Sequence, residues 1–190
     1  MKSFARLASS ALIAGASFLA LAPEAHALGP VDVEIGGRLG VGTKPDSRTA
    51  SPFGIGLGAR GGVSIFHVYG GLSAIHYFGS STELPTAGGT VNSQYSSTLL
   101  GVELGYSITI VPKLLLRPQL GLGNAALSFG NNASHDHLYL EPGVTALLLL
   151  GNLYFGADAN LLAVTGVPTG DDQTKTYAAL TAHVQIGLRF

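Results

Sequence analysis

One stretch of the chain decides the fold: VDVEIGGRLGV, residues 31–41. Apolar side chains occupy its odd positions, apart from Gly37, whereas Asp, Glu, Arg and Gly occupy its even positions. Successive side chains of a strand point to opposite faces, so this strand has one apolar face and one polar face. The polar face is too narrow and too rich in glycine to be the outside of a soluble protein. The pattern indicates a barrel in lipid, apolar outside and polar inside.

Similar alternation recurs along the chain and predicts strands at 31–42, 53–64, 68–78, 97–108, 113–125, 137–148, 153–164 and 176–190. The connections alternate between long ones (43–52, 79–96, 126–136, 165–175) and short ones (65–67, 109–112, 149–152). An even number of strands with long loops on one rim is typical of bacterial outer-membrane barrels. We therefore predict an all-β fold, a closed antiparallel up-and-down transmembrane β-barrel of eight strands. Both termini of the barrel domain would lie on the side of the short turns, facing the periplasm.

The charged residues test this assignment of faces. We place the apolar face of each strand outside, which puts Phe53, Ile55 and Leu57 on the outer face of segment 53–64. No charged residue beyond residue 27 then faces lipid. Nine charged residues then fall in loops or turns: Lys44, Asp46, Arg48, Glu83, Lys113, Asp136, Asp171, Asp172 and Lys175. The others face inward: Asp32, Glu34, Arg38, Arg60, Glu103, Arg117, Glu141, Asp158 and Arg189.

Two features fit the scheme less well. In segment 68–78, His76 shares a face with Leu72 and Phe78, so the register of this strand stays open. Pro118 and Pro142 fall inside predicted strands, where proline removes a hydrogen bond of the ladder. We expect a local bulge at each proline.

The first 27 residues are typical of an export signal. A positive start with Lys2 and Arg6 precedes an apolar run over residues 8–22, and residues 25–27 form a small-x-small cleavage site. This predicts a cleaved signal peptide, 1–27, and one barrel domain, 28–190. The chain has no cysteine, which excludes disulfides and thiolate metal sites. Its 10 basic and 11 acidic residues include no basic tract, which argues against nucleic-acid binding.

The final segment, 178–190, alternates Ala, Leu, Ala, Val, Ile and Leu with other residues and ends on Phe190. Together with the pattern over 28–190, it resembles the small eight-stranded outer-membrane proteins of Gram-negative bacteria, the group of the OmpA membrane domain, OmpX and the opacity-type proteins. The resemblance implies a monomer in the cell outer membrane, in contact with its lipids, with Phe190 as the signal to the barrel-assembly machinery. It also implies a non-catalytic structural or surface-interaction role. The chain stops after the eighth strand, so the peptidoglycan-binding domain of OmpA, and a tethering role, are not expected.

A barrel of eight strands is only wide enough for side chains to fill its interior. Glycines on the inner wall would leave room for long side chains from other strands. Folding the hairpins predicts the pairs Glu34–Arg60, Glu103–Arg117 and Asp158–His183. We expect these residues, with Asp32, Arg38, Glu141 and Arg189, to form an ionic network that plugs the lumen. Its simplest role is to neutralise buried charge, and a gating role or a small ion channel is the alternative.

Two groups of residues suggest an enzyme instead. Asp158 and His183 have the types of a base and its orienting carboxylate, but no serine or cysteine is obviously placed for activation. Ser134, His135, His137 and Glu141 at the outer rim resemble in composition, but not in spacing, the residues of outer-membrane lipid deacylases. His135 and His137 share a face, as two metal ligands would. We expect no catalytic residue, metal or cofactor, and keep a lipid-modifying enzyme and a soluble periplasmic ligand-binding barrel as alternatives.

Overall fold

The computed structural model describes residues 31–43, 51–86, 89–129, 134–169 and 173–190. The predicted signal peptide and the loop charges Lys44, Asp46, Arg48, Asp171 and Asp172 lie outside these residues. The described chain forms nine strands: β1 Val31–Thr43, β2 Ile55–Ile65, β3 Val68–Thr86, β4 Gly89–Tyr106, β5 Ile108–Val111, β6 Leu114–Phe129, β7 Ser134–Leu150, β8 Leu153–Thr169 and β9 Gln173–Arg189. No helix among the described residues is long and apolar enough to cross a membrane.

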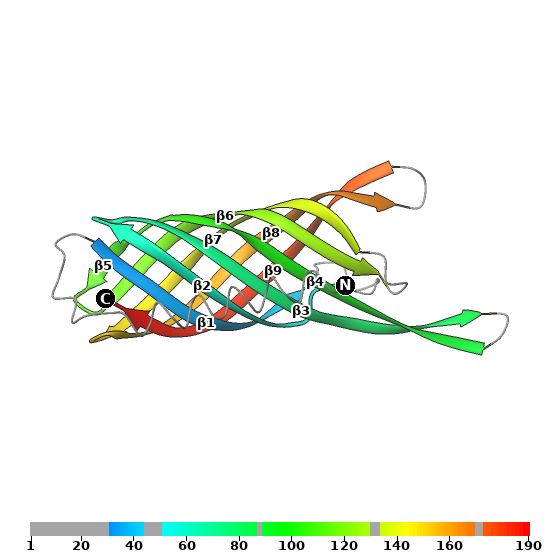
Figure 1. Cartoon of the computed structure of the whole chain (residues 1–190), viewed down its shortest axis with the longest axis horizontal. Coiled ribbons are helices and arrows are strands. Elements are labelled where there is room, and N and C mark those ends of the chain that lie inside the picture. The colour runs from blue at the N-terminus through cyan, green and yellow to red at the C-terminus, as the bar shows by residue number, and fades with distance from the viewer. Residues whose placement is uncertain (1–30, 44–50, 87–88, 130–133, 170–172) are drawn as a thin grey trace, which may run out of the picture.

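The strands form one closed antiparallel barrel (Figure 1). Each strand pairs with its sequence neighbours, except that β4 and β5 do not pair with each other; β1 pairs with β9, and β4 pairs with β6. Backbone hydrogen bonds between Val33 and Phe190, 2.9 Å in both directions, extend the β1–β9 seam to the last residue. Closure leaves no sheet edge in the wall, as a barrel in lipid requires. The predicted fold class is confirmed.

β4 and β5 are two parts of one strand of the barrel wall, so the wall consists of eight strands. The β4–β6 ladder stops at Gly105–Gln119, and the β5–β6 ladder resumes at Ile108–Leu116, three residues further along each strand. Pro118 lies in this gap and has no N–H to donate to β4. On its other side Pro118 pairs normally with Val144.

Pro142 interrupts the β7–β8 ladder in the same way, between Leu140–Ala163 and Gly143–Asn160. The expected bulges at Pro118 and Pro142 are therefore wrong. A proline removes one hydrogen bond on one side of its strand, which breaks a ladder without inserting a residue.

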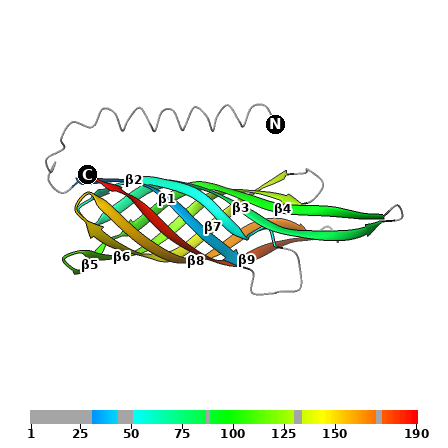
Figure 2. The ribbon, with the colours of Figure 1, turned by 90° about the horizontal axis from the view of Figure 1, so that it is seen from below.

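Several strands extend well beyond the predicted ends at the loop side. The β3–β4 ladder continues to Thr86–Gly89, so most of the predicted loop 79–96 is a protruding hairpin (Figures 1 and 2). β6, β7, β8 and β9 are likewise longer than expected. Glu83 in β3, Asp136 in β7 and Lys175 in β9 therefore lie in strands and not in loops. Bulges interrupt the extensions between Phe78 and Ser81 and between Val164 and Val167. Gly166 in the second bulge has a φ of +73°, which favours glycine.

The outer wall is apolar and the inner wall is packed. Outward side chains such as Leu57 and Leu100 are 61% and 62% exposed, whereas inward ones are mostly buried. β3 has Tyr69, Ile75 and Tyr77 inside, which settles its register and leaves His76 outside. There His76 Nδ1 lies 2.8 Å from Thr98 Oγ1 on the neighbouring β4.

Phe53 is an exception to the predicted faces. It was expected outside, but its side chain is only 3% exposed and lies inside the barrel. β2 begins at Ile55, and residues 51–54 precede it as a connecting segment, so the alternation of the strand does not apply to Phe53.

Candidate functional site in the barrel interior

Three groups of side chains fill the interior along its length. An apolar cluster lies toward the loop end, a band of charged and polar groups occupies the middle, and a smaller cluster of Leu115, Leu147 and Tyr154 lies toward the turn end. The alternation of the strands predicted the charged band, whereas the apolar clusters were not predicted.

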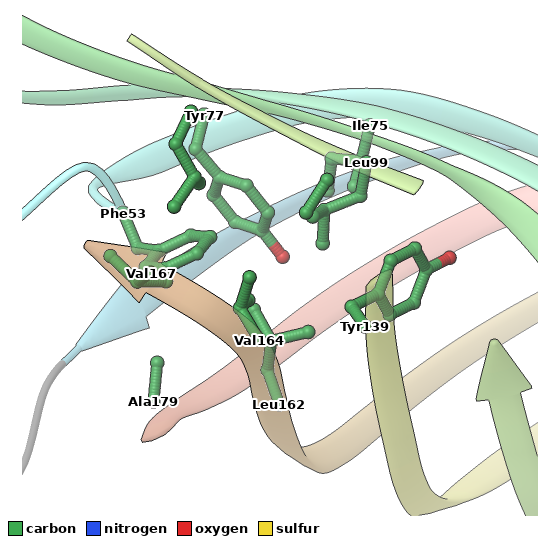
Figure 3. Packing of buried hydrophobic residues seen from close by; sticks show 11 residues of the cluster. Phe53, Ile75, Tyr77, Leu99, Tyr139, Leu162, Val164, Val167 and Ala179 are labelled. Atoms are coloured by element: carbon green, nitrogen blue, oxygen red, sulfur yellow. The ribbon is translucent and has the colours of Figure 1, made fainter. Parts of the chain in front are cut away.

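The loop-side cluster, termed the apolar plug, lies in the loop-side part of the barrel interior. Figure 3 shows Tyr77 of β3 pointing toward Leu162 and Val164 of β8, with Phe53 and Val167 at one end and Tyr139 at the other. The plug comprises Phe53, Ile75, Tyr77, Leu99, Ala125, Leu127, Tyr139, Leu162, Val164, Val167 and Ala179. A signal for it exists in the sequence: runs such as 161–164 are apolar at every position, so both faces of the strand are apolar there.

Arg38 is the centre of the charged band. Its Nη1 lies 2.9 Å from Glu103 Oε1, and its Nη2 lies 3.1 Å from Asp158 Oδ2. These residues come from β1, β4 and β8, so a single guanidinium joins separate walls across the lumen. All three side chains are almost completely buried, where their attraction is weakly screened.

Arg60 adds a second cation to the same carboxylate. Its Nη2 lies 2.8 Å from Glu103 Oε2, and its Nη1 donates to Gln185 Oε1 over 3.2 Å. The guanidinium carbons of Arg60 and Arg117 lie 4.9 and 4.1 Å from the ring centre of Tyr69, within range of a cation–π interaction.

Arg117 holds Glu34 through two hydrogen bonds of 2.9 and 2.7 Å, and its Nε donates to Ser107 Oγ over 2.9 Å. The predicted pairs Glu34–Arg60 and Glu103–Arg117 are thus wrong. They were derived from neighbouring strands, but long side chains in a narrow barrel reach strands that are not neighbours. At the turn-side rim, Arg189 pairs with Asp32.

Asp158 and His183 face each other across the β8–β9 ladder, as predicted. His183 Nδ1 lies 2.5 Å from Asp158 Oδ1, and Asn160 Nδ2 donates to the same oxygen over 2.6 Å. His183 Nε2 lies 2.5 Å from the hydroxyl of Tyr77. A phenol from the plug therefore occupies the position at which a nucleophile would stand in a hydrolase triad. Asp158 and His183 link the charged band to the plug.

Inward glycines make room for these side chains. A Cβ on Gly40 would overlap the His183 ring, and one on Gly101 would overlap the Tyr139 hydroxyl. Gly105 receives Arg117, and Gly143 receives Asn160. The predicted role of the inner-wall glycines is confirmed, since large side chains lie directly over them.

The rim residues proposed for a lipid hydrolase do not form a triad. His135 and His137 share a face of β7, with ring centres 6.4 Å apart, but Ser134 lies on the opposite face. Glu141 lies four residues deeper along the strand, roughly 13 Å away at the usual rise. Among the described residues, no group of three or more His, Cys, Asp or Glu side chains is placed to hold a metal ion.

No protein-family model and no curated protein sequence matches this chain. Solved structures do match its fold. Neisserial surface protein A (NspA) is 11% identical, with a TM-score of 0.52 over 85% of this chain and 96% of its own. A major outer membrane protein of Thermus thermophilus is 11% identical, with a TM-score of 0.53 over 87% of this chain and 100% of its own.

The N-terminal β-barrel domain of Pseudomonas aeruginosa OprF is 14% identical, with a TM-score of 0.50 over 84% of this chain and 97% of its own. At such low identity these likenesses concern the fold alone. The chain has the fold of the small outer-membrane barrels.

Proposed function

We propose that this chain is a non-catalytic barrel protein of the bacterial outer membrane, with a structural or surface-interaction role and a lumen closed by its own side chains. The apolar outer wall supports the location, because unpartnered apolar side chains encircle the barrel. Its partners would be outer-membrane lipids and, through Phe190, the barrel-assembly machinery.

The contacts of Arg38 carry the proposal of a closed lumen. They join β1 to β4 and β8 across the interior, and the apolar plug lies between this band and the loop end. An ion moving along the axis would have to break a buried ion pair and then cross apolar contacts. Both steps are costly.

Membrane fractionation tests the location. We expect the protein in the outer-membrane fraction, and we expect unboiled samples to migrate differently from boiled samples on a detergent gel. Recovery in the soluble fraction after osmotic shock would instead favour the periplasmic ligand-binding barrel.

Planar-bilayer recordings test the closed lumen. We expect the wild-type protein to show no steady open state at neutral pH, whereas steady conductance would favour the small ion channel.

Lipid A acyl content, measured with and without the protein, tests the absence of catalysis. A loss of acyl chains that depends on the protein would favour the lipid-modifying enzyme.

A further inference from the structure

The buried interior holds more carboxylates than guanidinium groups. Among the described residues that are buried, the carboxylates are Glu34, Glu103, Glu141 and Asp158, and the guanidinium groups are Arg38, Arg60 and Arg117. Asp32 and Arg189 at the rim neutralise each other. With every carboxylate ionised, the negative groups would outnumber the guanidinium groups, and an excess of charge is costly away from water.

The contacts identify Glu141 as the carboxylate in excess. Glu34 is held by Arg117, Glu103 by Arg38 and Arg60, and Asp158 by Arg38 and His183. In the part of the chain that the structure describes, no ion pair to Glu141 is found. Its hydrogen bond comes from a neutral group, the Thr181 hydroxyl, which donates to Oε1 over 2.8 Å.

The surroundings of Glu141 come from several walls. β6 presents Gly121 beside it, and β7 itself supplies Tyr139. The titratable groups that face it from the other walls are Arg38 of β1, Tyr77 of β3, Glu103 of β4 and His183 of β9. Asp158 of β8 lies behind His183, to which it is hydrogen-bonded. The cations among them are already engaged by other carboxylates. Glu141 is only 7% exposed, so its charge would have little contact with water.

We propose that Glu141 is a proton-binding site inside the barrel, which holds a proton at neutral pH and releases it in alkaline solution. The neutral acid removes the excess charge, so each remaining buried carboxylate keeps a guanidinium partner. The proton exchanges with water, and no other bond forms or breaks.

Ionisation would act on the apolar plug, a consequence that rests on the proposed closed lumen. Tyr139 and Tyr77 of the plug face Glu141, so a new charge there would draw water or a cation beneath the plug. We expect the closed lumen to loosen in alkaline solution.

Infrared spectroscopy of the folded protein tests the site directly. We expect the carbonyl band of a protonated carboxylic acid at neutral pH, its loss in alkaline solution, and its absence in Glu141→Gln. Asp32→Asn, which changes the rim carboxyl group, is the matched control and should keep the band. No such band in the wild-type protein, or a band that persists in Glu141→Gln, would overturn the proposal.

If Glu141→Gln fails to fold, carbon NMR of glutamate-labelled wild-type protein gives the same answer, because the side-chain carboxyl signal of a neutral acid differs from that of a carboxylate. All glutamate signals at the ionised position at neutral pH would refute the site. Conductance separates the two proposals: a lumen open at neutral pH contradicts the closed lumen, while the carboxyl band still decides the proton site.

Discussion

Arg117 shows how much one interior residue contributes to the stability of the barrel. Its side chain is completely buried, and it donates hydrogen bonds to Glu34 and Ser107. Arg117→Ala leaves Glu34 buried without its cation, and breaking a buried pair in this way costs about 3–5 kcal/mol. We expect a loss of that size in the free energy of unfolding, measured by denaturant titration in lipid vesicles.

Arg189→Ala is the control for this variant. The Arg189 side chain is partly exposed at the rim, and its Nε lies 3.9 Å from Glu34 Oε1. Solvent screens its pair with Asp32, and Glu34 keeps the two shorter bonds from Arg117, so the loss should be about 0–1 kcal/mol. Equal losses in Arg117→Ala and Arg189→Ala would contradict the role assigned to the buried pair. Bilayer conductance of Arg117→Ala also separates gating from charge neutralisation, because unchanged conductance rules out gating by this residue.

Gly101 provides a steric prediction. A Cβ on this residue would lie 2.5 Å from the Leu122 carbonyl oxygen and would overlap the Tyr139 hydroxyl. We expect Gly101→Ala to lower the free energy of unfolding by about 1–3 kcal/mol, as overpacking does. Gly37 is the matched glycine on the outer face, where the nearest atom to a Cβ is 3.9 Å away. Gly37→Ala should therefore change stability little, and a similar loss in both would refute the steric explanation.

At the scale of strands, Pro118 explains why one strand of the wall is divided into β4 and β5. Pro118→Leu restores an N–H opposite Tyr106, and we expect the ladder to become continuous with a gain of about 0.5–1.5 kcal/mol. Amide hydrogen exchange at Tyr106 measures the change and should slow, whereas the Ser107 amide, which already donates to the His67 carbonyl over 2.7 Å, should change little. Pro142→Leu is the parallel variant on β7, with its effect confined to the β8 side. Unchanged exchange at Tyr106 would mean that the gap has another cause.

The strands also show where alternation is informative. In the middle of the barrel lipid lies on one side and side chains on the other, so each strand alternates and its position can be predicted. At the loop side the hairpins leave this environment, and backbone pairing continues through residues with no alternating pattern. That is why the predicted ends of β3, β4, β8 and β9 were short.

For the whole molecule, the apolar outer wall predicts a strong penalty for charge. Val102 lies on the outer face of β4, between Leu72 and Leu122 in register. Val102→Arg should destabilise the barrel in bilayers by about 2–4 kcal/mol if this position is near the midplane. Val102→Leu is the apolar control and should have little effect. A tolerated arginine, measured by unfolding in vesicles, would contradict a lipid-facing wall.

The amino-acid sequence by itself determined the barrel, the strand number of the closed wall and the inward direction of nearly every charge, because lipid outside and polar groups inside impose a two-residue period on each strand. Only the tertiary structure decided which charges meet, that an apolar plug fills the loop-side lumen, and that Glu141 lacks a cation among the described residues. Those contacts join strands that are distant in sequence, and their geometry depends on how far each side chain reaches across the closed barrel.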